Sequence, residues 1–349
     1  MDSPNENSKE KMLSEMRNLL KESYLIKNPL NGKFVIQICH EKDDEFVIDP
    51  CPFCEGNEKS TPLEITARRD NGGSNQSGWR VRVVPDKNPI FRVEKQKRLG
   101  MDIYDFISAT GANEIIVESS RHDDTWPNMP AEKIKEILGV FGERISDLKK
   151  DGNIRQVLVY KNYGSGTRVK ITHPHAVVVG SPVISSAMKE KLWHLKKHFN
   201  SKNRCLLCDI LGVEEKNGER IIMESRSHIL LAPPWSRVPY EMLVLPKRHE
   251  PFFEESFFDL EFAAMLKTAI MKLNAVVTGE EDGVSYTMVV YTAPNQNACW
   301  SKWQTLREDF HWHIEIIPRI RLYSSFEIAT GFHINNVLPE EAAEVLRKA

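Results

Sequence analysis

Residues 157–180 read VLVYKNYGSGTRVKITHPHAVVVG. Both ends of this stretch are apolar and predict strands, and a loop rich in Gly, Ser and Thr with the cations Arg168 and Lys170 joins them. His173 and His175 stand at positions i and i+2, where side chains of one strand point to the same face. A loop of this composition can hold an anion near the two rings, which favours nucleophilic histidine chemistry on a phosphate ester. Taken alone, the motif also fits an ordinary surface strand.

The motifs around this stretch occur twice, in the same order. A C-x-x-C pair opens each series, at 51–54 and again at 205–208. A Glu followed by Arg-His at one fixed spacing comes next, first as Glu114 to His122 and then as Glu241 to His249. Each series ends with a His-x-His strand, HPH in the first and HWH in the second. The repeat is about 150 residues long, too long for a solenoid unit, so we interpret it as a duplicated domain.

The duplication predicts an α+β protein of two related domains, each an antiparallel sheet with flanking helices. A length of 349 residues is compatible with two domains. Apolar residues at helical spacing between residues 8 and 22 predict an amphipathic helix. We therefore divide the chain into an N-terminal helical arm (1–25), a first domain (26–183) and a second domain (184–349).

Composition limits the possible partners and compartments. The net charge is −2, which implies no general attraction to nucleic acid or to a membrane surface. No apolar run is long enough to span a bilayer, and the polar N-terminus lacks the core of a signal peptide. We therefore expect a cytoplasmic protein. In a reducing compartment its six cysteines are expected to be thiols or metal ligands rather than disulfides.

The repeated Cys and His motifs predict two metal sites. Thiolates and imidazoles suit tetrahedral Zn²⁺, which takes four ligands in a structural site. His228 competes with His249 as a ligand, and the repeated Glu-to-His spacing favours His249. The alternative for each C-x-x-C is a reduced pair that closes a turn. If His173 binds metal, His175 stays available for chemistry on a strand that the metal holds in place. The predicted ligands are Cys51, Cys54, His122 and His173 in the first site and Cys205, Cys208, His249 and His311 in the second.

Together these motifs resemble the galactose-1-phosphate uridylyltransferase family, the double-domain branch of the histidine-triad superfamily. The resemblance implies two tandem histidine-triad-like domains, each an antiparallel half-barrel-like sheet with flanking helices. The resemblance runs from NPLNGKFVI (28–36) through CPFC, SSRH, KNYGSG and HPH to HWHIEIIPR, and ends in FEIATGFHINNVLPEEAAEVLR (326–347). The second C-x-x-C is most similar to the branch with two zinc sites, which includes plant ADP-glucose phosphorylase. Other members hold iron in the second half.

The resemblance implies ping-pong nucleotidyl transfer. The histidine that the family uses as its nucleophile falls on His175, which would attack the α-phosphorus of a nucleoside-diphosphate sugar, release sugar 1-phosphate and pass the nucleotide to a second phosphate. Family members commonly dimerise, so a homodimer is expected. The implied binding residues are Asn162, Gly164, Ser165, Gly166 and Thr167 for the phosphates and Asp86 and Asn88 for the nucleoside; for the last two, a polar turn is the alternative.

Three positions depart from the family pattern. Val177 stands where the family usually has a Gln that stabilises the nucleotidyl intermediate, and Lys170 stands where Ser is common. The position at which sugar-uridylyl transferases hold the hexose with a Glu is His333 in a gapped alignment. Arg168 and Lys170 are candidates to neutralise the phosphate in place of the Gln; the alternative is that both are solvated loop cations.

These departures leave three functions open. The first is transfer of a nucleoside monophosphate between sugar 1-phosphates, from UDP-glucose to a hexose 1-phosphate. The second is phosphorolysis with inorganic phosphate, of ADP-glucose, diadenosine tetraphosphate or adenylylsulfate. The third is nucleotide binding without turnover. His313 matches His175 in the repeat, but no glycine-rich loop precedes it, so we expect His313 to be structural or accessory.

Overall fold

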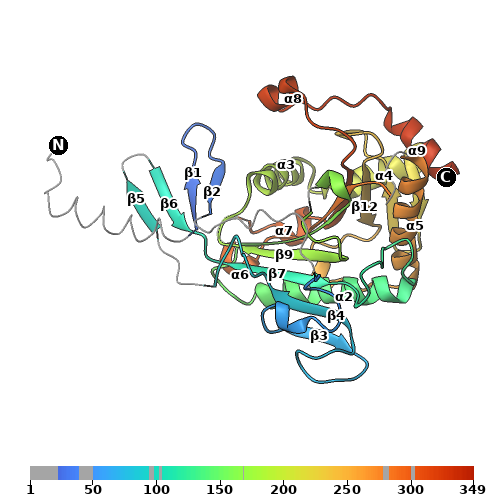
Figure 1. Ribbon diagram of the computed structural model, residues 1–349. Coiled ribbons are helices and arrows are strands. Elements are labelled where there is room, and N and C mark those ends of the chain that lie inside the picture. Colours follow the sequence, from blue (N-terminus) through green and yellow to red (C-terminus); the bar gives the residue numbers. More distant parts are fainter. Residues whose placement is uncertain are drawn as a thin grey trace, which may run out of the picture.

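The computed structural model describes residues 23–38, 50–93, 98–101, 104–167, 169–277, 283–299 and 303–349 (Figure 1). The predicted helix at 8–22 and Arg168 lie outside the described residues. Tyr24 and Leu25, which we placed in the arm, belong to the first strand. The strands are β1 (Tyr24–Lys27), β2 (Phe34–Gln37), β3 (Thr66–Arg69), β4 (Trp79–Pro85), β5 (Arg98–Met101), β6 (Tyr104–Ser108), β7 (Ala112–Val117), β8 (Gln156–Tyr163), β9 (His175–Ser181), β10 (Ile221–Glu224), β11 (His228–Leu231), β12 (Met242–Pro246), β13 (Tyr286–Tyr291) and β14 (His313–Pro318).

The helices lie mainly between these strands. The long helices fall where apolar residues recur at helical spacing, as in residues 131–148 and 186–202. The helices are α2 (Ala131–Leu148), α3 (Ser186–Lys202), α4 (Leu206–Asn217), α5 (Leu260–Val276), α6 (Gln296–Cys299), α7 (Leu306–Asp309), α8 (Ser325–Thr330) and α9 (Pro339–Lys348), with 3₁₀ turns η1 (Glu58–Ser60), η2 (Ser165–Thr167) and η3 (Phe253–Glu255).

The duplication is visible in one ten-stranded sheet. Its order is β10-β11-β12-β14-β13-β8-β9-β7-β4-β3, and neighbouring strands pair antiparallel. Counted outward from the central β13–β8 pair, the two sides repeat the same succession of elements, and β9, β7, β4 and β3 follow one another in Figure 1. The α+β class and the tandem arrangement are confirmed. The two half-sheets are joined edge to edge, from Tyr286 opposite Tyr163 to Val290 opposite Val159.

One face of this sheet carries the main core. Alternate residues of β8, such as Val157 and Val159, are buried in a cluster with the apolar faces of α2 and α5. Phe141 of α2 and Phe262 of α5 are fully buried there. This layer fixes the position of β8 and β9, and therefore of every residue that those strands present on the opposite face.

The opposite face is covered by two elements. A four-stranded sheet of order β2-β1-β6-β5 packs on β9, where Leu25, Phe91 and Ile107 form a small core with Val179 and Val183. Farther along, α3 crosses the strands of the second half, since its Lys191 contacts residues of β14. On this face, the side chains of β9 therefore lie next to a covering sheet, and those of β14 lie next to a covering helix.

Candidate metal centres and nucleophile

The first predicted ligand set is brought together. The ligand atoms of Cys51, Cys54, His122 and His173 all lie within 4.8 Å of one another. Cys54 Sγ is 3.4 Å from His122 Nδ1 and 3.6 Å from His173 Nδ1. A tetrahedral zinc ion with ordinary Zn–S and Zn–N bonds separates its S and N ligands by about 3.5 Å. The residues present therefore fit zinc.

The imidazoles of this set are oriented through their second nitrogen. His173 Nε2 donates to Ser119 O at 2.7 Å, and His122 Nε2 lies 3.0 Å from Thr172 Oγ1. A hydrogen bond at one ring nitrogen fixes the tautomer and leaves the other nitrogen with a lone pair for a metal. The chain segment around Cys51 is itself tied down, because Asn57 Nδ2 donates to Cys51 O at 2.8 Å.

The second set repeats this construction. Cys208 Sγ lies 3.4 Å from His249 Nδ1 and 3.5 Å from His311 Nδ1, and Cys205 completes a group whose ligand atoms lie within 4.8 Å of one another. His311 Nε2 donates to Pro246 O and His249 Nε2 to Arg307 O, at 3.0 and 2.9 Å. The competing His228 is not in the set: its buried ring stacks on Phe262 instead.

His175 stands immediately beside the first set, at the start of β9. Its Nδ1 donates to His173 O at 2.7 Å, so Nε2 is the ring nitrogen that keeps the lone pair. Phe53, between the two ligand cysteines, packs edge-on against the ring at 5.4 Å between centroids. Desolvation lowers the pKa of His175 to about 4, against the hydrogen bond to His173 O, which raises it. His173 lies just before the strand rather than within it.

The Gly/Ser/Thr loop is held by the second half of the chain. Gly166 N donates to Ser285 Oγ at 2.9 Å, and Thr167 Oγ1 donates to Gly164 O at 2.8 Å. Gly164 has a positive φ of 82°, and a Cβ there would lie 2.3 Å from Ser285 Oγ. On β8, Asn162 Oδ1 accepts from Thr287 Oγ1 at 2.8 Å. Sequence reasoning missed Ser285 and Thr287, because only the β8–β13 pairing brings them here.

The predicted nucleoside residues form a polar corner after β4. Asp86 accepts from Asn88 N at 2.9 Å and from Asn113 Nδ2 at 3.1 Å. Asn113 is buried, and its Oδ1 has no hydrogen-bond partner within the part of the chain that the structure describes. Burial and the charge of Asp86 raise the pKa of Tyr160. The corner therefore offers acceptor oxygens two strands away from His175.

Val177 has an apolar environment. It pairs with Tyr160 in the sheet, and both side chains pack against the small core under the four-stranded sheet. The position that carries the family's Gln is thus part of a hydrophobic contact between two sheets. Lys170 is exposed beyond the loop, and Arg168 lies outside the described residues.

The second half holds its matching histidine in a closed polar cluster. His313 Nδ1 donates to His311 O at 3.1 Å, and its Nε2 accepts from Lys191 Nζ at 3.0 Å. Lys191 also pairs with Glu315, which in turn binds Arg237. The ring of Tyr291 stacks on His313 at 4.9 Å. His313 therefore has both nitrogens engaged, which agrees with a structural or accessory role.

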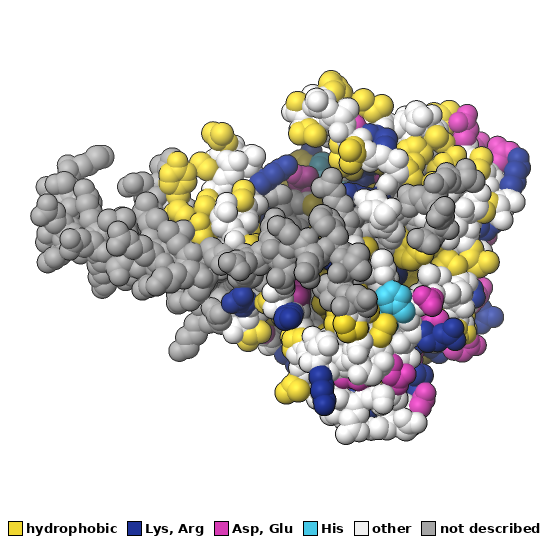
Figure 2. All heavy atoms as spheres, in the orientation of Figure 1, with side chains coloured by type: hydrophobic (Ala, Val, Ile, Leu, Met, Phe, Trp, Pro, Cys, Tyr) yellow, Lys and Arg dark blue, Asp and Glu magenta, His cyan; other side chains and the backbone are white. Residues whose placement is uncertain are grey.

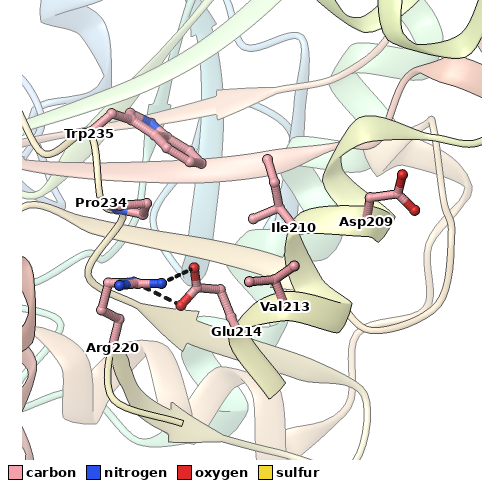
Figure 3. Close-up of a pocket in the computed structure, with 7 residues that line it drawn as sticks. All are labelled: Asp209, Ile210, Val213, Glu214, Arg220, Pro234 and Trp235. Atoms are coloured by element: carbon pink, nitrogen blue, oxygen red, sulfur yellow. Dashed lines mark hydrogen bonds and ion pairs between the residues drawn. The ribbon is translucent and has the colours of Figure 1, made fainter. Parts of the chain in front are cut away.

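The other surface features include none of the predicted ligands. A pocket of about 320 Å³ is formed by α4 and the loop with Pro234 and Trp235, and neither His nor Cys lines it (Figure 3). Hydrophobic side chains gather over α8 at the top of the molecule (Figure 2), where Phe326, Ile328 and Phe332 are exposed. His333 is in this segment, 5.4 Å from the ring of Tyr323. Within the described residues, no helix is long and apolar enough to cross a membrane.

Comparisons with known proteins agree with the motifs. Residues 82–184 match the model of the galactose-1-phosphate uridyl transferase N-terminal domain. A galactose-1-phosphate uridylyltransferase of Thermotoga maritima is 28% identical over 68% of this chain and 74% of its own length. An ADP-glucose phosphorylase of Arabidopsis thaliana is 25% identical over 85% of this chain and 81% of its own length.

Solved structures show the same fold. A uridylyltransferase structure matches with a TM-score of 0.76 at 23% identity, covering 93% of this chain and 97% of that one. The Arabidopsis thaliana ADP-glucose phosphorylase, solved with bound ADP-glucose, matches with a TM-score of 0.72 at 23% identity, covering 93% and 98%. At these identities the structures establish the fold alone.

Proposed function

Because this chain belongs to the galactose-1-phosphate uridylyltransferase family, we propose that it is a nucleotidyltransferase that works through a covalent nucleotidyl-His175 intermediate. The observation that carries this proposal is the tautomer of His175. Its Nδ1–H is bound to His173 O, and the adjacent Cys₂His₂ group fixes the segment that bears it. The reactive nitrogen is therefore Nε2, held in one orientation before substrate arrives.

The proposed reaction has two half-reactions. In the first, the Nε2 lone pair attacks the α-phosphorus, an N–P bond forms, and the bond from that phosphorus to the bridging oxygen breaks. The bridging oxygen keeps its electron pair and leaves on the sugar 1-phosphate. In the second, a phosphate oxygen of the acceptor attacks the same phosphorus, and the N–P bond breaks to restore neutral His175.

The chain's other residues would bind and orient the substrate. We assign the α- and β-phosphates to the loop formed by Gly164, Ser165, Gly166 and Thr167, with Asn162 beside it, and the nucleoside to Asp86 and Asn88. Arg168 and Lys170 would neutralise the phosphate. They would thereby take the place of the family's Gln, where this chain has Val177. Zinc in the two Cys₂His₂ groups would act structurally, since each group already offers four ligands and leaves no open coordination position.

Two acceptors remain as candidates, and the preferred one is a hexose 1-phosphate, with UDP-glucose as donor. Phosphorolysis of ADP-glucose is the second candidate, favoured by Val177, by His333 and by the similarity to an ADP-glucose phosphorylase. We also propose a homodimer, for which the exposed apolar residues over α8 provide surface. We also propose a cytoplasmic location, because paired cysteines in a reducing compartment are expected to bind metal rather than to form disulfides.

Acceptor choice can be tested directly. The enzyme is incubated with UDP-glucose or ADP-glucose and either labelled galactose 1-phosphate or labelled inorganic phosphate. The preferred function predicts that label from the hexose 1-phosphate enters a nucleoside-diphosphate sugar at least about tenfold faster than label from phosphate enters nucleoside diphosphate. The reverse ratio would replace transferase with phosphorylase. Exchange with neither acceptor would contradict both.

The state of His175 predicts a flat pH profile for the first half-reaction. A histidine pKa lowered to about 4 means that Nε2 stays unprotonated well below neutral pH. The single-turnover rate of adduct formation should therefore be constant between about pH 6 and 8. With an ordinary histidine, whose pKa is about 6.5, the rate would fall to half its maximum near pH 6.5. Quenched-flow measurements of adduct yield against time at each pH separate the two cases.

A further inference from the structure

A buried ion pair lies beneath the segment that carries His173 and His175. Lys161 Nζ is 2.6 Å from Glu118 Oε2, and the two side chains are 2% and 0% exposed. Trp126 Nε1 donates to the same oxygen at 3.0 Å. Lys161 precedes Asn162 on β8, and Glu118 directly follows β7. The pair therefore connects the two strands that flank β9.

Backbone groups of Glu118 and of the residue after it bind the His-Pro-His segment. Glu118 N donates to Pro174 O at 3.0 Å. The next residue, Ser119, accepts the hydrogen bond from His173 Nε2 at 2.7 Å. The peptide between Pro174 and His175 is thus held from the Glu118 side, and the orientation of this peptide sets the direction of the His175 side chain.

The second half shows that the fold does not require this pair. Val117 is opposite His175, and Leu245 is next to the Val244–Ile314 pair and so opposite His313. By this register Pro246 corresponds to Glu118; counted from the ligand histidines, whose Nε2 atoms donate to Ser119 O and Pro246 O, the counterpart is Leu245. Both Leu245 and Pro246 are buried and uncharged, so neither can form the ion pair.

The lysine has an apolar counterpart by the same register. Lys161 lies one residue beyond the Tyr160–Val177 pair and so opposite Ala176, whereas in the second half Val290 is opposite Ile314. Val290 is fully buried. The second half has thus built the same sheet with an apolar residue at the place of Lys161.

Stability is also a weak reason for such a pair. Two charges lose their hydration when buried, and replacing both by apolar groups is often neutral or stabilising. Here Glu118 Oε1 has, in addition, no hydrogen-bond partner within the described residues. A buried, incompletely bonded charge lowers stability. The first half, which carries His175, keeps this charge, whereas the second half has apolar residues at the same places.

We propose that Glu118 and Lys161 are positioning residues for the nucleophile: their ion pair fixes the Pro174 carbonyl and thereby aims His175 Nε2 at the α-phosphorus. This inference rests on the proposed function. Neither residue needs to touch the substrate. Their removal should therefore slow formation of the N–P bond and leave donor affinity unchanged, because the phosphate loop and the Asp86 corner stay intact.

The test compares matched double variants. Glu118→Leu/Lys161→Met replaces both charges by apolar side chains, as in the second half. Glu114→Leu/Arg144→Met removes a buried ion pair of similar geometry (2.7 Å) between β7 and α2, away from the His-Pro-His segment. Glu118→Gln is added as an isosteric single change in case the first double variant does not fold. Each is assayed for bound zinc, for donor affinity and for the single-turnover rate of adduct formation.

The expected result is a rate lower by about 10- to 100-fold in Glu118→Leu/Lys161→Met and in Glu118→Gln, with unchanged donor affinity and zinc content. The Glu114/Arg144 variant should keep the wild-type rate. Folded, zinc-loaded Glu118 variants that form adduct at the wild-type rate would show that the pair is only structural, and an equal loss in the Glu114/Arg144 variant would show that the effect is not local. If the wild-type enzyme itself formed no adduct, the proposed function would fail first and this inference with it.

Discussion

The variant His175→Ala should form no nucleotidyl adduct and should lose at least about 10⁴-fold in transfer rate, because the reaction then lacks its nucleophile. The ring lies beside the first ligand set but is not part of it, so zinc binding and folding should be retained. The measurement is adduct formation and sugar-phosphate exchange, with zinc content determined on the same sample. Exchange within tenfold of wild type would remove His175 from the mechanism.

His313→Ala is the matched control. It removes the corresponding histidine of the second half, whose Nε2 already accepts a hydrogen bond from Lys191. Adduct formation at His175 should therefore remain. A label that maps to His313 in the wild-type protein, or that disappears in His313→Ala alone, would contradict this account, because the nucleophile would then lie in the second half.

The second large effect is expected from Cys54→Ser. Serine cannot replace a thiolate in a zinc site, so the first Cys₂His₂ group should lose its metal. Zinc bound at such sites contributes about 10 kcal/mol or more to folding of small domains, against a total stability of about 5–15 kcal/mol for a typical protein. We expect one zinc fewer per chain, a lower thermal midpoint and loss of adduct formation, since His173 would no longer be fixed.

Cys208→Ser provides the comparison within the same chain. It disables the second group, which has the same S-to-N distances. Zinc content should again fall by one and the thermal midpoint should fall, while adduct formation at His175 persists in the protein that remains folded. Metal analysis that shows no zinc in the wild-type protein, or no change in either variant, would contradict the zinc assignment.

Much of the fold and of the two ligand sets was predictable, because the same short motifs occur in both halves of the sequence. The apolar alternation of residues 157–160 and 175–180 predicts strands, and the repeated C-x-x-C, Arg-His and His-x-His order predicts both ligand sets. The Glu-to-His spacing favours His249 over His228, and His249 is the one that lies with Cys205, Cys208 and His311. These predictions depend on local periodicity and on the comparison of one half with the other.

Contacts between the halves were not predictable in this way. Ser285 and Thr287 reach the loop and Asn162 only because β13 pairs with β8. Lys191 contacts His313 only because α3 packs across the strands of the second half. Such contacts join residues far apart in sequence through strand pairing and helix placement, which no short motif encodes. The apolar contact that surrounds Val177 has the same origin.

The most direct test of the central claim is intact-protein mass spectrometry after incubation with UDP-glucose or ADP-glucose in the absence of acceptor, followed by peptide mapping. The account predicts a mass increase of one nucleoside monophosphate, located on His175 and absent from His175→Ala, and the donor that produces it identifies the base. No adduct and no exchange of labelled sugar 1-phosphate with either donor, in a protein that binds the nucleotide, would contradict it and leave a nucleotide-binding protein without turnover.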